Sequence, residues 1–323
     1  MDNPKVSVLL PVYNAERFLN YSLDSLFAQS FQDFEIVAID DGSTDRSSSI
    51  LRNYEDSRLR VFRNDQNIGL IRTLNKGIEL CRGKYIARID ADDSALPHRL
   101  ETQVGFLESN PDTFLVFSGR TSIDDSGNEI AIHNRVVTGD GLIRWKLLTG
   151  NFITHSSVVF RTSSIPKPLF DTKYLYAEDY AAWLLLLSEG KFESTIEPLV
   201  KYRFHGDSVS AQHRTTQVNS AMTALQSHLQ RNYRIRFSVE SLALWSSPED
   251  ANDYAKQSDF LELLHWMHPM NSHFEFFSGS KERAHALYHY YRRLTFLLVT
   301  HRARRELTFP IARAFLSFPF FRQ

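Results

Sequence analysis

Residues 85–93 constrain the fold of this chain more than any other stretch. The segment is a short apolar run that ends in three acids, Asp90, Asp92 and Asp93. Apolar and β-branched residues favour a buried strand, and three ionised carboxylates repel one another unless a cation or a basic partner lies between them. Ligands of open α/β sheets bind at the carboxyl ends of the strands. The stretch therefore predicts a strand that brings negative charge, and with it a divalent metal, to a ligand-binding edge.

Predicted strands and helices alternate through the first part of the chain. We expect strands at residues 5–11, 34–39, 59–62 and 85–89, with helices at 15–29 (Asn14 as N-cap), 46–54, 67–81 and 97–109. This alternation with short links is typical of a doubly wound α/β fold with a largely parallel sheet. Asp40 and Asp41 end the second strand. Both acid clusters therefore lie at the same edge of the sheet.

The second half of the chain divides into a mixed part and a helical part. We expect strands at 114–118, 153–161 and 199–205, a hairpin turn at 124–128, and an apolar helix at 181–188. From about residue 212 only helix is expected. We therefore divide the chain into an α/β domain, residues 1–213, and a helical C-terminal region, residues 214–323, for which a membrane-associating role is considered below.

Composition excludes several classes of protein. The chain has 323 residues, 42% of them hydrophobic, and a net charge of −1, which gives no reason to expect a nucleic-acid partner. Cys81 is the only cysteine, so neither a disulfide framework nor a thiolate metal site is available. The sequence has no apolar run of 18 residues and no evident signal peptide. We expect a cytoplasmic protein, or one peripheral to the inner face of a membrane.

An ordered set of short motifs carries a family resemblance. The motifs are Pro11-Val12-Tyr13-Asn14, Asp40-Asp41-Gly42-Ser43-Thr44-Asp45, Asn67-Ile68-Gly69, Asp90-Ala91-Asp92-Asp93, Glu178-Asp179 and Tyr202-Arg203-Phe204-His205. Smaller matches are Gly83-Lys84-Tyr85-Ile86-Ala87, Pro97-His98-Arg99-Leu100 with Gln103, and Trp183. Over residues 4–211 the set resembles the inverting family 2 glycosyltransferases of the GT-A fold, of the kind that builds bacterial surface glycans. The C-terminal third carries no matching motif.

The resemblance implies a donor site and a metal site. The donor would be a UDP- or dTDP-sugar, and the metal Mn²⁺ or Mg²⁺, which oxygen and imidazole ligands suit. Asp92 or Asp93 would bind the metal, with His205 as a further ligand. The remaining donor-binding residues implied by the motifs are Pro11, Tyr13, Asn14, Asp40, Asp41, Asn67, Gly69, Arg72, Asp90, Ala91 and Asp92. Either Asp40 or Asp41 would accept the N3–H of the base, and Arg72 would contact the diphosphate near a helix N-terminus.

Asp179 is the candidate catalytic base. Inversion by direct displacement needs one carboxylate to take the proton of the acceptor hydroxyl, because the metal serves the leaving group. Glu178, His155 and Trp183 are expected on the acceptor side, where a glycan or a lipid-linked saccharide would bind. Asp179 and Glu178 also suit the start of an apolar helix, a structural role that is compatible with catalysis.

Two other functions are compatible with an α/β scaffold of this kind. A nucleotidyltransferase would need a basic, glycine-rich loop after the first strand, and residues 11–16 do not form one. A non-catalytic sugar-nucleotide or glycan-binding protein would not need the acids and His205 together. Residues 281–323 hold nine Lys or Arg and two acids among many aromatic residues. This pattern favours contact with an anionic membrane surface.

Overall fold

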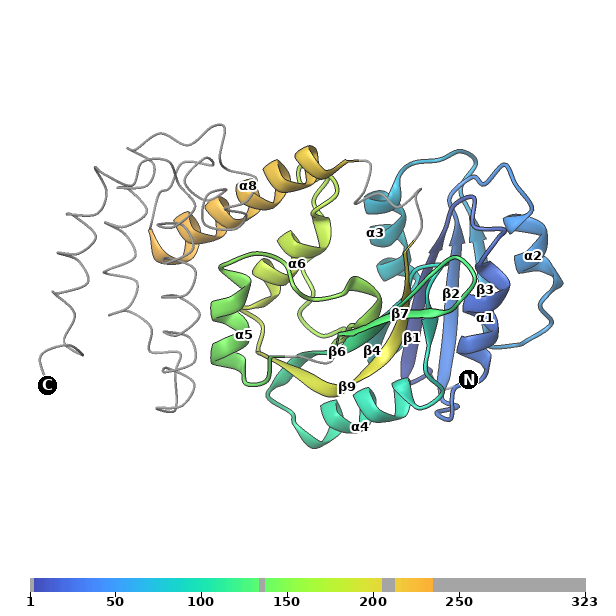
Figure 1. Cartoon of the computed structure of the whole chain (residues 1–323), viewed down its shortest axis with the longest axis horizontal. Coiled ribbons are helices and arrows are strands. Elements are labelled where there is room, and N and C mark those ends of the chain that lie inside the picture. Colours follow the sequence, from blue (N-terminus) through green and yellow to red (C-terminus); the bar gives the residue numbers. More distant parts are fainter. Residues whose placement is uncertain (1–2, 134–136, 205–212, 235–323) are drawn as a thin grey trace, which may run out of the picture.

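A mixed sheet organises the described residues, 3–133, 137–204 and 213–234, of the computed structural model (Figure 1). Its strands are β1 (Val6–Val12), β2 (Phe34–Asp40), β3 (Leu59–Arg63), β4 (Tyr85–Arg88), β5 (Ser94–Ala95), β6 (Thr113–Ile123), β7 (Glu129–His133), β8 (Val159–Arg161) and β9 (Lys191–Arg203). The strand order is β3-β2-β1-β4-β8-β6-β9-β5, and β7 pairs with β6. This arrangement confirms the predicted doubly wound α/β class, in a sheet that mixes parallel and antiparallel strand pairs.

The strand register brings the two acid clusters to one edge. β1 pairs in parallel with both β2 and β4, so that Val12 lies opposite Asp40 and Leu9 lies opposite Arg88. The carboxyl ends of β2 and β4 therefore face the same way. β8 is antiparallel to β4 and to β6. The short β5 pairs antiparallel with β9, which brings the end of β9 beside the acids after β4.

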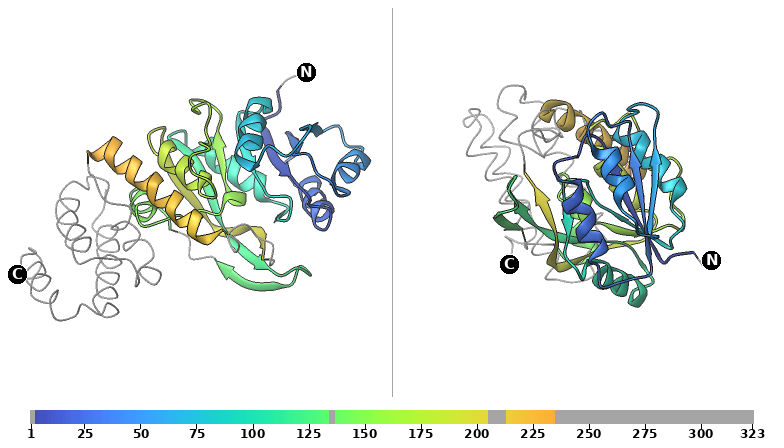
Figure 2. Two further views of the ribbon diagram at one scale, coloured as in Figure 1. Left: turned by 90° about the horizontal axis from the view of Figure 1, so that it is seen from above. Right: turned by 90° about the vertical axis from the view of Figure 1, so that its right-hand side faces the viewer.

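Helices cover both faces of the sheet (Figure 2). They are α1 (Leu19–Phe27), α2 (Ser47–Asn53), α3 (Leu70–Leu80), α4 (Arg99–Ser109), α5 (Asp140–Leu147), α6 (Glu178–Leu186) and α8 (Arg214–Tyr233), with a 3₁₀ turn at His155–Ser157. Alternate residues of β1 serve the two faces: Leu9 packs with α3, whereas Val8 and Leu10 pack with α1. This period-2 alternation produces two hydrophobic cores, one on each side of the sheet.

Helix α8 packs against α6 at one end of the sheet (Figure 1). Its Met222, Leu225 and Leu229 are buried in the same core as Trp183. The start of the predicted C-terminal region therefore rests on the α/β body, and the division at residue 213 stays a prediction. Residues 235–323, including the basic segment, lie outside the described residues. Among the described residues, no helix combines the length and the apolarity needed to cross a membrane.

One predicted strand is shorter than expected. Residues 153–161 were expected to be extended throughout, but only Val159–Arg161 forms a strand. The Ser157 hydroxyl and amide both donate to the Thr154 carbonyl, at 2.8 and 2.9 Å. Such local side-chain hydrogen bonds compete with the sheet ladder. They close the 3₁₀ turn that precedes β8.

Helix boundaries differ from the sequence prediction in two functional places. α1 begins at Leu19 with Phe18 as N-cap, so Asn14 does not cap it. α6 begins at Glu178 rather than at residue 181, which puts Glu178 and Asp179 in its first turn. The sequence prediction also lacked α5 and the first half of β9, both of which belong to the described fold.

Candidate active site

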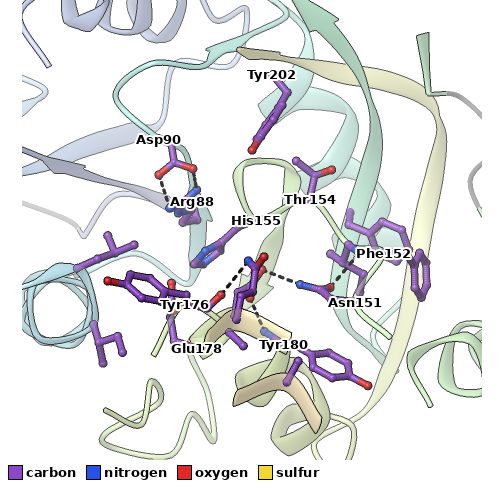
Figure 3. A pocket seen from close by; sticks show the side chains of 18 of the residues that line it. Arg88, Asp90, Asn151, Phe152, Thr154, His155, Tyr176, Glu178, Tyr180 and Tyr202 are labelled. Carbon is purple, nitrogen blue, oxygen red and sulfur yellow. Dashed lines mark hydrogen bonds and ion pairs between the residues drawn. The ribbon is translucent and has the colours of Figure 1, made fainter. Parts of the chain in front are cut away.

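A cavity of about 1020 Å³ lies where the carboxyl end of β4 meets the start of α6. Among the residues predicted to be functional, those that line it are Gly69, Arg72, Asp90, Asp92, His155, Glu178 and Asp179. Figure 3 shows Asp90 and Arg88 on one wall, with Asn151 and Phe152 across from them. The cavity thus combines Asp90 and Asp92 of the acid cluster after β4 with the two carboxyl groups on α6, whereas the buried Asp93 does not line it.

The acids after β4 form one close group. One carboxylate oxygen from each of Asp90, Asp92 and Asp93 lies within 4.8 Å of the others. Asp90 is ion-paired through both oxygens with the buried Arg88 guanidinium and accepts a 3.0 Å hydrogen bond from the Ser156 hydroxyl. Asp90 is therefore already neutralised by the protein, which favours Asp92 and Asp93 as the carboxylates for a cation.

Of the three acids, Asp93 is the one that a bound cation would stabilise most. Its side chain is buried, and Oδ1 accepts the Arg203 backbone N–H at 2.8 Å. Oδ2 is buried without a hydrogen-bond partner among the described residues. Burial, and then the charges of Asp92 and Asp90, raise the pKa of Asp93 well above its ordinary value. A divalent cation at Oδ2 would pair with the carboxylate and offset the repulsion from Asp92 and Asp90, so these residues fit the metal that the resemblance implies.

Arg99 and Gln103 on α4 support the strand end that carries the acids. Arg99 is completely buried, and its guanidinium donates to the carbonyls of Arg88 and Val158 at 2.9 and 3.2 Å. The Gln103 amide donates to the Ser157 carbonyl at 2.8 Å. The sequence motif around Arg99 therefore has a structural role: its hydrogen bonds hold the carboxyl end of β4 against the 3₁₀ turn.

The second acid pair, after β2, is bound within the protein. Asp40 accepts the Ser43 N–H at 2.8 Å, and its Oδ2 lies 3.5 Å from the Arg63 guanidinium. Asp41 accepts hydrogen bonds from the Asn64 side chain, the Ile68 N–H and the Gly69 N–H, at 2.7 to 3.0 Å. Asp41 thus ties the end of β2 to the loop before α3. A carboxylate has about four acceptor positions, so contact with a base is compatible with these bonds.

The loop after β1 is fastened to the loop after β2. The Asn14 N–H donates to the Ser43 hydroxyl at 3.0 Å, and the Asn14 side-chain oxygen accepts the Thr44 N–H at 2.9 Å. Asn14 has φ +48°, a left-handed conformation that asparagine tolerates. Tyr13 remains 49% exposed beside this loop, whereas Pro11 is buried. None of Pro11, Tyr13 and Asn14 lines the cavity.

The start of α3 contributes one rim of the cavity. Gly69 is its N-cap and has φ +87°, and its N–H is shared between Asp41 and the side chain of Asn67, both at 3.0 Å. The first N–H groups of this loop therefore already serve an internal carboxylate. Arg72 is exposed and lines the cavity. Asn67 is exposed and Ala91 is buried, and neither lines the cavity.

Asp179 lies in the first turn of α6 and is held by two donors. Its Oδ1 accepts the Tyr180 N–H at 2.6 Å, and its Oδ2 accepts the Asn151 amide at 2.8 Å. Burial raises the pKa of Asp179, although both hydrogen bonds oppose the rise. Burial, followed by the charge of Asp179, raises the pKa of Glu178 to about 7. The cavity therefore holds carboxyl groups that titrate closer to neutral pH than free carboxylates do.

His155 and Trp183 pack behind the two carboxyl groups. The His155 ring meets the Trp183 ring edge to face at 5.4 Å, and its Nε2 is buried without a partner among the described residues. Burial, then the charge of Arg88, lowers the pKa of His155 well below its ordinary value. Trp183 is completely buried and does not line the cavity. Its contact with the His155 ring connects it to the predicted acceptor side.

Comparison with known proteins identifies the family. The family model described as Glycosyl transferase family 2 matches residues 7–167. An uncharacterized glycosyltransferase of Haemophilus influenzae is 35% identical over 237 residues, which are 68% of this chain and 72% of that protein. The chain belongs to glycosyltransferase family 2. This confirms the resemblance to family 2 drawn from the motifs, and it makes the protein a glycosyltransferase.

Further relatives of this family 2 glycosyltransferase carry functional names. The putative glycosyltransferase EpsE of Bacillus subtilis is 31% identical, over 69% of this chain and 81% of that protein. The Escherichia coli protein WfgD, named a UDP-Glc:α-D-GlcNAc-diphosphoundecaprenol β-1,3-glucosyltransferase, is 25% identical over 65% of this chain and 81% of its own. The solved structure of S. aureus TarS in complex with UDP-GlcNAc has a TM-score of 0.62 at 15% identity, covering 94% of this chain and 92% of TarS. This likeness confirms the GT-A fold.

Several residues that shape the site of this glycosyltransferase were not predicted as site residues. Asn151 contacts Asp179, and Lys146 and Tyr176 line the cavity from α5 and from the segment before α6. The Arg120 guanidinium lies over the Tyr202 ring, 4.5 Å from its centroid, where β6 and β9 pair. None of these residues follows a predicted strand end, which was the signal that located the acids. His205, the predicted third metal ligand, lies outside the described residues.

Proposed function

We propose that this glycosyltransferase moves a hexosyl or N-acetylhexosaminyl group from a UDP- or dTDP-sugar to a hydroxyl of a glycan or lipid-linked saccharide, with inversion and with Mn²⁺ or Mg²⁺. The observation that carries the proposal is the cavity itself. It presents Asp90 and Asp92 of the acid cluster after β4, and the separate carboxylate of Asp179 on α6, to one space. Direct displacement needs this division, because leaving group and nucleophile react on opposite faces of the sugar.

Asp92 and Asp93 would hold the metal on the leaving-group side, with His205 proposed as a further ligand. When bound, the metal supplies positive charge against the departing diphosphate. The protein's own contribution is orientation: Arg203 fixes Asp93 through its backbone N–H and donates from its side chain to the Asp92 carbonyl at 3.0 Å. Asp90, paired with Arg88, is left to accept hydrogen bonds from sugar or ribose hydroxyls.

Asp179 would take the proton from the acceptor hydroxyl. Its two donors, Asn151 and the Tyr180 N–H, leave the remaining lone pairs of the carboxylate for that proton. General base catalysis of this kind contributes about 10²–10⁴-fold to the rate. Glu178 and His155 would shape the acceptor side around it, with Trp183 behind His155.

The nucleoside would bind at the joined loops after β1 and β2. Pro11, Tyr13 and Asn14 would contact the base, one of Asp40 and Asp41 would accept its N3–H, and Asn67, Gly69, Arg72 and Ala91 would contact the rest of the nucleotide. Two comparisons support this donor class. TarS has been solved with UDP-GlcNAc, and the name of WfgD specifies UDP-Glc as donor. The name of WfgD also specifies a lipid diphosphate acceptor.

A lipid-linked acceptor would place the enzyme at the inner face of the membrane. The sequence support is the basic, aromatic-rich segment 281–323. Flotation with anionic liposomes at low salt tests this part alone. Full-length protein is expected to float with anionic vesicles and to stay behind with neutral ones; protein that stays unbound in both cases contradicts it.

A thermal-shift screen of nucleotide sugars tests the donor class. A ligand that binds the folded state raises the melting temperature by mass action. UDP- or dTDP-sugars are expected to raise it with Mn²⁺ present and to do so less with EDTA, whereas GDP- and CMP-sugars should have no effect. No shift with any nucleotide sugar, with or without Mn²⁺, would contradict the proposal.

A further inference from the structure

Lys146 places a positive charge in the cavity without a counter-ion. It lies in the last turn of α5, is partly buried, and lines the cavity. Its ammonium lies 4.4 Å from the centroid of the Phe152 ring. Among the described residues it has no ion pair and donates no hydrogen bond. The other lysine and arginine side chains of the cavity have hydrogen-bond acceptors. Arg88 is paired with Asp90, and Arg203 donates to backbone carbonyls. Arg72 donates to the Ile68 carbonyl and Arg120 to the Thr154 hydroxyl.

The ammonium of Lys146 is only partly compensated. The Phe152 ring attracts it through a cation–π interaction, and the carboxyl end of α5 attracts it weakly. Neither is an anion, and burial lowers the pKa of Lys146. Removing an ammonium from water is costly unless an anion pairs with it. An anionic ligand group at this point would remove that cost.

The acids of the cavity do not supply that anion, because no carboxylate of the described residues forms an ion pair with Lys146. Burial lowers the pKa of Lys146, in keeping with the lack of a paired carboxylate. The anion that Lys146 suits is therefore expected to come from a ligand.

The contacts of Phe152 place Lys146 on the acceptor side. Phe152 follows Asn151, which donates to Asp179, and both residues line the cavity. An acceptor whose hydroxyl reaches Asp179 lies beside Asn151, and a further group of that acceptor can extend over Phe152 toward Lys146. We propose that Lys146 and Phe152 form an acceptor subsite for an anionic group, either a phosphate that links the saccharide to a lipid or the carboxylate of a uronic acid. This inference rests on the proposed role of Asp179.

Binding measurements with defined probes test the subsite without turnover. The probes are a farnesyl diphosphate-linked N-acetylhexosamine, a hexuronate disaccharide, and neutral octyl N-acetylhexosaminide. They are titrated into the full chain by calorimetry in the presence of UDP and Mn²⁺. The wild-type protein is expected to bind one of the two anionic probes more tightly than the neutral one, and the preferred probe identifies the source of the charge.

Lys146→Gln is the test variant, and Lys84→Gln is its matched control. Lys84 is exposed and pairs with Glu108, away from the cavity. Lys146→Gln should weaken binding of the preferred anionic probe by roughly tenfold or more, as expected for the loss of a charged hydrogen bond. Binding of the neutral probe and of UDP should not change. Lys84→Gln should change none of these affinities.

Three results would overturn the subsite. The first is a wild-type protein that binds UDP but binds the anionic and neutral probes equally, or binds none of the probes. The second is an affinity for the preferred anionic probe that is the same in Lys146→Gln as in the wild-type protein. The third is loss of UDP binding in Lys146→Gln, which would assign Lys146 to the donor site. Failure of the proposed function is separate: it would appear as absence of UDP binding in the wild-type protein.

Discussion

The Asn151 amide donates a 2.8 Å hydrogen bond to Oδ2 of Asp179. The orientation of that amide is itself fixed, because its oxygen accepts the Ile153 N–H at 3.1 Å. Asn151 therefore presents an N–H, rather than an oxygen, to the carboxylate. A hydrogen bond to the charged form of a carboxyl group lowers its pKa. Asn151 thus opposes the rise that burial causes in the pKa of Asp179, and it fixes the position of Oδ2.

Asn151→Ala is expected to lower kcat by roughly tenfold and to move the acidic limb of the pH–rate profile to higher pH. The sign follows from the lost donor: the pKa of Asp179 rises further, so a higher pH is needed to form the base. The profile of kcat against pH measures this. Asn110→Ala, at the exposed end of α4, serves as the control. A lower kcat without a shift of the acidic limb would show that Asn151 has only a structural role and does not tune the pKa of Asp179.

Arg88→Gln is expected to destabilise the fold by about 2–4 kcal/mol, because it removes one partner of a largely buried ion pair. Arg88 is 3% exposed in its side chain and Asp90 is 32% exposed. Arg17→Gln provides the contrast, since the Arg17–Asp125 pair is exposed on both sides and should cost less than about 1 kcal/mol. Urea titration compares the two variants. Equal losses would show that the Arg88–Asp90 pair contributes no more than a surface pair.

Gly42→Ala is expected to destabilise the protein more than Gly127→Ala. Both glycines have positive φ, +71° and +88°, so both variants bear the left-handed penalty of about 1 kcal/mol. Only at Gly42 would the new Cβ meet backbone, 2.5 Å from the carbonyl carbon of Gln66. At Gly127 nothing lies within 4 Å. Thermal melts should show a larger decrease in melting temperature for Gly42→Ala. Identical melting temperatures for the two variants would mean that the loop containing Gln66 moves to accommodate the new Cβ without cost.

His228 is expected to make stability depend on pH below neutrality. Burial lowers its pKa in the folded state to about 4, so the unfolded chain binds a proton first as the pH falls below about 6.5. The contribution is complete above pH 6.5 and is lost between about pH 6.5 and pH 4. Buried carboxyl groups such as Glu178, whose pKa is raised to about 7, act in the opposite direction.

The difference between wild-type protein and His228→Gln isolates this effect. The free energy of unfolding of the wild-type protein should fall by about 2–3 kcal/mol more than that of the variant between pH 7 and pH 4. Urea titrations at both pH values measure the difference. Parallel pH dependences in the two proteins would show that His228 is protonated equally in the folded and unfolded states.

Strand ends were the part of the site that the sequence revealed. Residues at the carboxyl ends of parallel strands must share an edge, so the approach of Asp90 and Asp92 to one ligand-binding edge follows from local pattern alone. The same logic correctly placed Asp40 and Asp41 at that edge. It gave no sign that Asp41 would hold the loop at Ile68 and Gly69 through three hydrogen bonds.

Contacts between segments distant in sequence were the part of the site that could not be predicted from the sequence. Asn151 reaches Asp179 across 28 positions, and Arg203 reaches Asp93 across 110. Neither pair has a local signature, because each depends on how β9, α6 and the 3₁₀ turn dock on the sheet. The 3₁₀ turn itself was missed because the Ser157 hydroxyl, a local competitor of the strand, decides the conformation there.

The separation of base from leaving-group site is the central claim, and Asp179→Asn tests it most directly. Asparagine preserves the size of the side chain and removes the base. UDP binding with Mn²⁺, measured by calorimetry, should match that of the wild-type protein, while sugar transfer should fall by about 10²-fold or more. Transfer at the wild-type rate, or loss of UDP binding together with transfer, would contradict the account.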